Sequence, residues 1–353
     1  DAIYSVLNLI SLTIFTLLAV GFGWLYWRLV FRWLHAPGGN GNKEGGWAKA
    51  LLFLVIAVLA VRGGITNRKS VNIVHAFDGP HLAAGYLTLN APFSAYHTLR
   101  SSSVVQTKFM PDDEAFSIVQ DELSISAKDV LLPDFPLYRD SISNQADPLI
   151  QPPLNVVIIM LESWDAWYLD TWRRAAGMQP LGLTPEFDKL AAEGRFFSDF
   201  YATGQRSVHG VAAILASMPT LPGVPYIGTG GLEQNNLSFV SSLAKDLNYS
   251  TFFFRSAARE SYRLHRVAQV GSFDLYKGAE DFLKENPQVE AHKFGVWDDV
   301  MFRNAAEYMA TLQQPFFGFL FPSSTHHPFS VPHLKWESDA SSDREGRYKN
   351  SLR

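Results

Sequence analysis

The sequence predicts an α/β fold with a largely parallel sheet flanked by helices, and two kinds of segment support this. The runs Leu154–Leu161 and Pro315–Phe321 are short, apolar and almost unbroken, which is typical of strands buried inside a parallel sheet. Tyr249–Phe254 has the same character. Segments with helical patterns separate these runs, and strands that alternate with helices characterise α/β proteins.

The segments between the strands carry helix signals. Thr184–Gly194 starts with a capping residue followed by proline and ends on glycine, so we expect a helix there. Further helices are expected over Val208–Met218, Leu232–Leu247 and Trp297–Gln313. The aromatic segment Arg195–Ala202 is expected to be a strand.

The composition excludes several classes of site. The 353 residues suggest about two domains, and 47% of them are hydrophobic. A net charge of −4 gives no sign of a nucleic-acid partner. The chain has no cysteine, so disulfides, zinc–thiolate sites, iron–sulfur clusters and cysteine nucleophiles are excluded.

Two apolar runs near the N-terminus predict transmembrane helices ahead of the α/β domain. Ile3–Val30 is long enough to span a bilayer, which needs about 20 residues. A second run covers residues 47–65, for which a buried core helix is the alternative. Basic residues between the two runs favour a cytoplasmic loop, which places the rest of the chain outside.

We therefore expect membrane helices over residues 1–65, a juxtamembrane segment and linker over 66–153, and the α/β domain over 154–353. The chain starts at an aspartate and ends in a polar stretch. We expect it to be truncated at both ends.

Polar residues follow the predicted strands at positions suited to chemistry. Ser207 lies near the first turn of a predicted helix, where backbone N–H groups and the helix dipole favour an anion, so it is a candidate nucleophile. The alternative is a simple N-cap. Glu162 follows the first strand, where α/β sheets bind ligands, although a carboxylate there also caps helices.

His326 and His327 follow the last strand in the same way. One edge of the sheet can therefore collect the serine, the carboxylate and the histidines. Hydroxyl and carboxylate oxygens suit Mg²⁺ or Mn²⁺, and Zn²⁺ is also possible. A bound metal would lower the pKa of the Ser207 hydroxyl and polarise a phosphoryl oxygen.

Several ordered motifs resemble the sulfatase/alkaline-phosphatase superfamily, and within it the membrane-anchored phosphoglycerol transferases of the lipoteichoic acid synthase type. The matching segments are Asn155–Asp165, Thr184–Leu190, Phe196–Tyr201, Thr203–Gly210, Phe294–Asp299 and Pro315–Phe329. The resemblance implies an alkaline-phosphatase-like fold. It also implies a multi-pass protein of the bacterial inner membrane with an extracytoplasmic catalytic domain.

By this resemblance, Glu162 is a metal ligand, and Ser207 is both a ligand and the covalent nucleophile. His326, and with it His327 and Arg263, would contact the phosphoglycerol group. The metal would be Mn²⁺, with Mg²⁺ or Zn²⁺ as alternatives. The implied donor is a phosphatidylglycerol-like lipid, and the implied acceptor is a glycan or polymer of the cell envelope.

The chain departs from the family pattern in two ways. The family usually has threonine where this chain has Ser207, and either hydroxyl can act as nucleophile. The family also supplies metal ligands from a downstream Asp-His pair, and this chain contains no Asp-His dipeptide. We expect the missing ligands to lie beyond Arg353.

Other functions stay open. A sulfatase needs proline and arginine two and four residues after its nucleophile, where this chain has His209 and Val211. A phosphoethanolamine transferase shares the implied fold but usually has several cysteines. The non-enzymatic alternative is a membrane-anchored relative that binds glycans without catalysis.

Overall fold

The computed structural model describes residues 153–218, 237–332, 337, 339 and 343–353, with shorter stretches before them (21, 24–25, 27–28, 30, 32, 51–56, 58–59, 73–77, 82–89, 91–100, 109–122 and 124). The chain separates into two compact units, Asp1–Asn72 and Ile73–Arg353. Most of the two predicted membrane spans lies outside the described residues.

The first unit contains helical residues in both apolar runs. The described residues between Gly21 and Arg32, and between Leu51 and Leu59, are all helical. Within the described stretches, no helix has the length and apolar character needed to cross a membrane. The two spans therefore stay predictions.

Short helices precede the sheet in the second unit. They are η1 (Ile73–Phe77), α3 (Leu82–Thr88), α4 (Ala91–Arg100) and α5 (Asp112–Glu122). Helix α5 lies in a stretch whose composition predicted a linker. Three acidic residues in its first turn favour the helix there, because carboxylates stabilise the positive end of the helix dipole.

The second unit is built on a four-stranded parallel sheet of order β1-β6-β2-β3. Its strands are β1 (Val156–Ile159), β2 (Ser250–Arg255), β3 (Leu275–Lys277) and β6 (Phe316–Phe321). The predicted parallel sheet flanked by helices is confirmed. A separate two-stranded ribbon joins β4 (Ala291–His292) to β5 (Gly295–Val296) in antiparallel fashion.

Strand β1 differs from the prediction of a fully buried strand. Among the described residues it pairs only with β6, so it lies at the edge of the sheet. Val156, Val157 and Ile159 keep 41%, 37% and 45% of their surface exposed. The apolar run identified the strand, but an apolar run does not fix a strand's place in the sheet. Strand β6, with every residue buried, is the buried strand that its sequence predicted.

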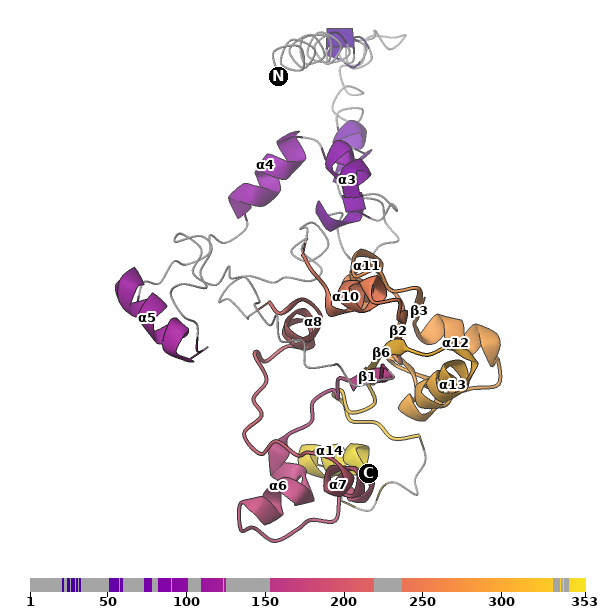
Figure 1. Cartoon of the computed structure of the whole chain (residues 1–353). Helices are drawn as coiled ribbons and strands as arrows, with labels where there is room; N and C mark the ends of the chain where they lie inside the picture. The colour runs from indigo at the N-terminus through magenta and orange to yellow at the C-terminus, as the bar shows by residue number, and fades with distance from the viewer. Residues whose placement is uncertain are drawn as a thin grey trace. The chain divides into compact units, whose positions relative to one another are not determined.

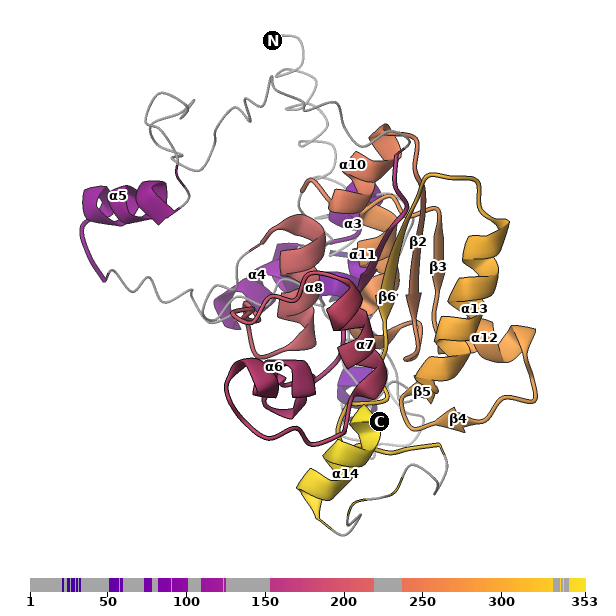
Figure 2. The same cartoon turned by 60° about the horizontal axis from the view of Figure 1, so that its bottom comes forward.

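Helices cover both faces of the sheet (Figures 1 and 2). Helices α8 (Ser207–Ala216), α10 (Val240–Asp246) and α11 (Leu264–Val270) pack on one face, and α12 (Ala279–Glu285) and α13 (Asp298–Thr311) pack on the other. Each face has its own core cluster of buried apolar side chains.

The aromatic run in β2 serves both cores because successive strand residues point to opposite faces. Phe253 packs in the core under α8 and α11, whereas Phe252 and Phe254 pack in the core under α12 and α13. Gly318 in β6 makes room for this arrangement. A Cβ at that position would lie 2.4 Å from the ring of Phe252.

Five further helical elements complete the described part of the second unit. They are η3 (Ala166–Tyr168), α6 (Asp170–Ala175), α7 (Pro185–Glu193), η4 (Ser261–Arg263) and α14 (Arg344–Leu352). Helix α7 has its predicted bounds. Arg195–Ala202 is not a strand as predicted: Phe200 and Tyr201 there are 79% and 81% exposed. Helix α10 starts at Val240, later than the predicted Leu232, and residues 237–239 before it are not helical.

Candidate active site

Glu162 lies just past the carboxyl end of β1. The backbone N–H of Met160 still donates to the carbonyl of Leu320, so the sheet pairing continues almost to this residue. The Glu162 side chain is buried, and its two carboxylate oxygens have different partners. Oε1 accepts a hydrogen bond from Ser163 Oγ at 2.9 Å, and Oε2 accepts one from Ser207 Oγ at 2.7 Å.

Ser207 is the first residue of α8. The N-cap position belongs to Arg206, whose side chain makes no capping hydrogen bond. The simple N-cap alternative for Ser207 is therefore wrong, because Arg206 takes the N-cap position and the Ser207 hydroxyl donates to Oε2 of Glu162. The N-terminus of α8 faces the same point, and its dipole favours an anion there.

Gly210 lets α8 approach β1 closely enough for this contact. A Cβ at Gly210 would lie 3.3 Å from the sulfur of Met160, tighter than most real Cβ contacts. The glycine lies one turn into α8, and Met160 lies two residues before Glu162. Close packing at this point therefore holds the start of the helix next to the carboxylate.

The loop after β6 is hydrogen-bonded to the backbone of Glu162. The hydroxyl of Thr325 is buried and donates to the backbone carbonyl of Glu162. Asp298, at the start of α13, accepts the backbone N–H groups of Ser323 and Ser324 at 2.7 and 2.9 Å. It also accepts the hydroxyl of Ser256 at 2.6 Å, so this one carboxylate joins the ends of β2 and β6.

The two histidines differ in their surroundings. His326 is half-buried: its ring packs against Phe294 with centroids 4.8 Å apart, and Nδ1 lies 2.8 Å from the carbonyl oxygen of His327. His327 is exposed and packs on Phe329. His326 directly follows Thr325, which places it beside the Glu162 loop. In the described part of the chain, no hydrogen bond links either imidazole to Ser207.

Arg255 is a charged residue near this site that the sequence analysis missed. It ends β2, is 3% exposed, and donates from Nη1 to the carbonyl of Ser261 at 2.8 Å. Burial lowers the pKa of the Arg255 guanidinium from its ordinary value, and the negative charge of Glu162 partly offsets this shift. A charged residue at the end of the run Ser250–Phe254 was the available sequence signal.

Arg263 follows in the η4 turn, whose first residue is the Ser261 bound by Arg255. Its backbone adopts the left-handed conformation with φ of 56°. Few residues other than glycine adopt this conformation, and functional sites are enriched in such positions. The role of Arg263 in binding substrate stays a prediction.

The residues present fit a divalent metal only in part. Glu162 and Ser207 place two hard oxygen donors within hydrogen-bonding distance of each other. Among the residues that the structure describes, no group of three or more His, Cys, Asp or Glu side chains could hold a metal ion. These two oxygens are therefore candidate ligands without a complete ligand set.

Comparisons with known proteins identify the family of this chain. The sulfatase family matches residues 154–351. The lipoteichoic acid synthase-like protein YvgJ of Bacillus subtilis (strain 168) is 22% identical over 80% of this chain, and lipoteichoic acid synthase 2 of the same organism is 23% identical over 50%. The aligned regions span 42% and 26% of those proteins.

A solved structure shows the same fold. A protein of the alkaline phosphatase superfamily from Vibrio parahaemolyticus aligns with a TM-score of 0.54 at 22% identity, covering 71% of this chain and 60% of that one. The predicted resemblance to this superfamily and to lipoteichoic acid synthases is confirmed. Since the family match covers more than half of the chain, the protein belongs to the sulfatase family.

Proposed function

We propose that this protein is a phosphotransferase that moves a glycerophosphoryl group from a phosphatidylglycerol-like lipid to a glycan or polymer of the cell envelope. The hydrogen bond between Ser207 and Glu162 at the start of α8 is the observation that carries the proposal. It aligns a hydroxyl oxygen at a helix N-terminus that favours a phosphate. The lipoteichoic acid synthase names of the two relatives support the choice of reaction.

In the first proposed step, Ser207 Oγ attacks the phosphorus of the donor. A bond forms between Oγ and phosphorus, the bond from phosphorus to the diacylglycerol oxygen breaks, and the serine proton ends on that departing oxygen. Glu162 orients Oγ for the attack. Arg255, buried and cationic beside Glu162, adds positive charge near the phosphate.

In the second step, a hydroxyl of the acceptor attacks the phosphoserine. Phosphorus binds the acceptor oxygen, its bond to Oγ breaks, and Ser207 recovers a proton. We propose that His326 contacts the transferred group, with Arg263 and His327 as further contacts. A divalent metal held by Glu162 and Ser207, Mn²⁺ before Mg²⁺ or Zn²⁺, would lower the pKa of the serine hydroxyl when bound.

The proposed location is the bacterial inner membrane, with the catalytic domain outside. Described helical residues of the first unit leave large apolar side chains exposed, among them Trp24, Leu52 and Ile56 at 55%, 53% and 55%. Such surfaces suit contact with lipid. Fractionation of cells that make the intact protein tests this: recovery in the soluble fraction contradicts the proposal.

The decisive experiment supplies the intact protein with phosphatidylglycerol labelled in its headgroup. We expect a labelled glycerophosphoryl adduct on Ser207 and release of diacylglycerol. Ser207→Ala abolishes both, Ser207→Thr keeps part of the activity, and Ser242→Ala on α10 is the matched control. Equal turnover by Ser207→Ala contradicts the nucleophile.

The same assay separates the alternatives. Release of diacylglycerol from phosphatidylethanolamine, and not from phosphatidylglycerol, indicates a phosphoethanolamine transferase. Hydrolysis of a sulfate ester without lipid turnover indicates a sulfatase. Glycan binding without any turnover of lipid or ester indicates a non-catalytic relative.

A further inference from the structure

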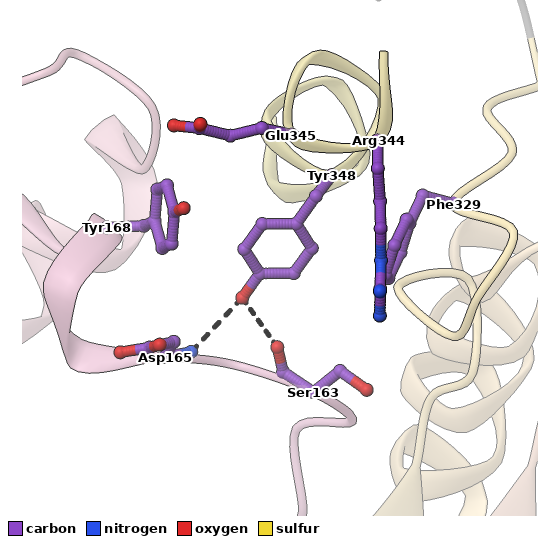
Figure 3. Close-up of a pocket in the computed structure, with 7 residues that line it drawn as sticks. All are labelled: Ser163, Asp165, Tyr168, Phe329, Arg344, Glu345 and Tyr348. Atoms are coloured by element: carbon purple, nitrogen blue, oxygen red, sulfur yellow. Dashed lines mark hydrogen bonds between the residues drawn. The ribbon is translucent and has the colours of Figure 1, made fainter.

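A pocket of about 460 Å³ includes in its lining Ser163, the residue that directly follows Glu162 (Figure 3). Its volume falls in the range of about 300–1,000 Å³ that small-molecule sites occupy. The residues that line it come from the loop after β1, from η3, from the loop after β6 and from α14: Ser163, Asp165, Tyr168, Phe329, Arg344, Glu345 and Tyr348.

Ser163 connects this pocket to the nucleophile. Its hydroxyl donates to Oε1 of Glu162, while Oε2 of the same carboxylate accepts from Ser207. One carboxylate group therefore separates a residue of the pocket wall from the proposed nucleophile. Ser163 has a left-handed backbone with φ of 56°, a conformation that non-glycine residues keep mainly where the surroundings enforce it.

Tyr348 enforces this conformation from α14. Its hydroxyl donates to the carbonyl of Ser163 at 2.5 Å and accepts the backbone N–H of Asp165 at 3.2 Å (Figure 3). The ring of Tyr348 stands in the middle of the pocket wall. Tyr168 and Phe329 meet it edge-on, with centroids 5.0 and 5.1 Å away. The rings of Tyr168, Tyr348 and Phe329 therefore form one contiguous aromatic wall.

The residues that line the pocket carry no surplus of positive charge. Arg344 lies over the ring of Phe329 at 6.0 Å, and Lys349 lies 2.9 Å from Glu345. Against these two cations stand the two carboxylates of Asp165 and Glu345. A phosphate site needs a surplus of positive charge or of N–H donors. This pocket offers instead aromatic rings for contact with C–H groups, and both acceptors and donors for hydroxyl groups.

We propose that this pocket binds a neutral sugar ring of the acceptor and presents its hydroxyl to the phosphoserine. The inference rests on the proposed function for the reaction but assigns the acceptor site and its chemistry independently of the donor. The donor phosphate binds on the other side of Glu162, at the start of α8 and near Arg255. Donor and acceptor thus approach Ser207 from different sides of one carboxylate.

Two exposed pocket residues allow a test with little risk to folding. In the intact protein, Arg344→Ala and Glu345→Gln remove a cation and a carboxylate from the pocket. Arg303→Ala and Glu307→Gln are matched controls on the exposed side of α13. The probes are maltohexaose and laminarihexaose, two neutral hexasaccharides of different linkage, with glycerol phosphate as the anionic comparison.

Each pocket or control substitution is measured in two ways. Binding of the probe is measured by saturation-transfer NMR in protein that also carries Ser207→Ala. Diacylglycerol release without acceptor is measured in protein that keeps Ser207. We expect at least one hexasaccharide to bind and the pocket variants to weaken its affinity about tenfold, because a hydrogen bond to a charged group is worth that much. Their diacylglycerol release stays at the wild-type level. The controls match the wild type in both measurements.

The outcomes separate this inference from the proposed function. If the pocket variants weaken saccharide binding, the sugar site is supported. If the wild type binds the saccharide but releases no diacylglycerol, the proposed glycerophosphoryl transfer is wrong and the sugar site stands. If neither hexasaccharide binds, the inference is overturned. It is also overturned if the pocket variants bind the saccharide as tightly as the wild type does. The same holds if the pocket substitutions reduce diacylglycerol release by the same factor as they reduce saccharide affinity.

Discussion

Asp298 Oδ1 accepts the backbone N–H of Ser323 at 2.7 Å, and this contact fixes the start of the loop that carries His326. The same carboxylate accepts two further hydrogen bonds, from Ser256 and Ser324. Two residues further along, Thr325 binds the carbonyl of Glu162. Asp298 therefore determines where the histidine loop lies without touching the proposed nucleophile.

We expect Asp298→Asn to lower the free energy of unfolding by about 2 kcal/mol, because hydrogen bonds to a charged acceptor are among the stronger ones. Urea unfolding measures this. Asp299→Asn is the control: that side chain is 64% exposed and pairs with Arg303 at 3.4 Å, so its loss changes stability by less than about 0.5 kcal/mol. Equal effects of the two substitutions contradict the anchoring role.

Gly295 is packed directly under the end of β2. A Cβ there would lie 2.1 Å from the carbonyl oxygen of Ser256, which is backbone and cannot move aside alone. Gly295→Ala is therefore expected to destabilise the protein by about 2 kcal/mol or more. Gly194→Ala is the control, since its Cβ would meet the Leu190 carbonyl at an ordinary 3.5 Å. Thermal unfolding that shows no difference between the two would refute the prediction.

Ionisation of the Tyr348 phenol is expected to lower the free energy of unfolding at alkaline pH. Burial raises the pKa of the Tyr348 phenol from 10.0 to about 12. A raised folded-state pKa contributes stability that is complete below pH 10 and is lost as the pH rises from about 10 towards 12, because the unfolded state releases its proton first. Tyr348→Phe should reduce this decline in unfolding free energy. An identical alkaline profile for wild type and variant shows that the phenol does not titrate as expected.

Glu162 is the carboxylate on which the proposed metal site depends. In the intact protein, Glu162→Gln keeps the size of the side chain but removes its charge. We expect the dissociation constant for Mn²⁺ to rise at least about tenfold, since even residues outside the ligand set change metal affinity by about 10–100-fold. Calorimetric titration with Mn²⁺ measures the change, with Glu186→Gln on the exposed side of α7 as the control. Unchanged Mn²⁺ affinity in Glu162→Gln removes this residue from the ligand set.

The sequence predicts strands and site residues correctly where burial and backbone geometry within a few residues determine the structure. The apolar run of β6 and the proline-capped start of α7 form as predicted, because burial and backbone geometry act within a few residues. Glu162 and Ser207 lie together because each follows or begins an element at the same edge of the sheet. Their catalytic and metal roles stay predictions.

Features that depend on distant parts of the chain could not be predicted in this way. The edge position of β1 follows from strand order, which an apolar run does not encode. Arg195–Ala202 has the aromatic content of a strand but no partner in the described sheet. Tyr348 contacts the Glu162 loop only because the chain folds back to it, so it did not stand out in the sequence.

The hydrogen bond from Tyr348 to Ser163 joins residues 185 positions apart, and that from Thr325 to Glu162 joins residues 163 positions apart. Contacts of such long sequence separation form slowly, because the chain loses conformational entropy on closing a long loop before the stabilising contact forms. During synthesis, the ribosome must therefore release almost all of this sequence before the Glu162 loop reaches its final shape. A nascent chain that already carries Ser207 still lacks the contacts that shape the Glu162 loop, so the proposed site is assembled only as folding is completed.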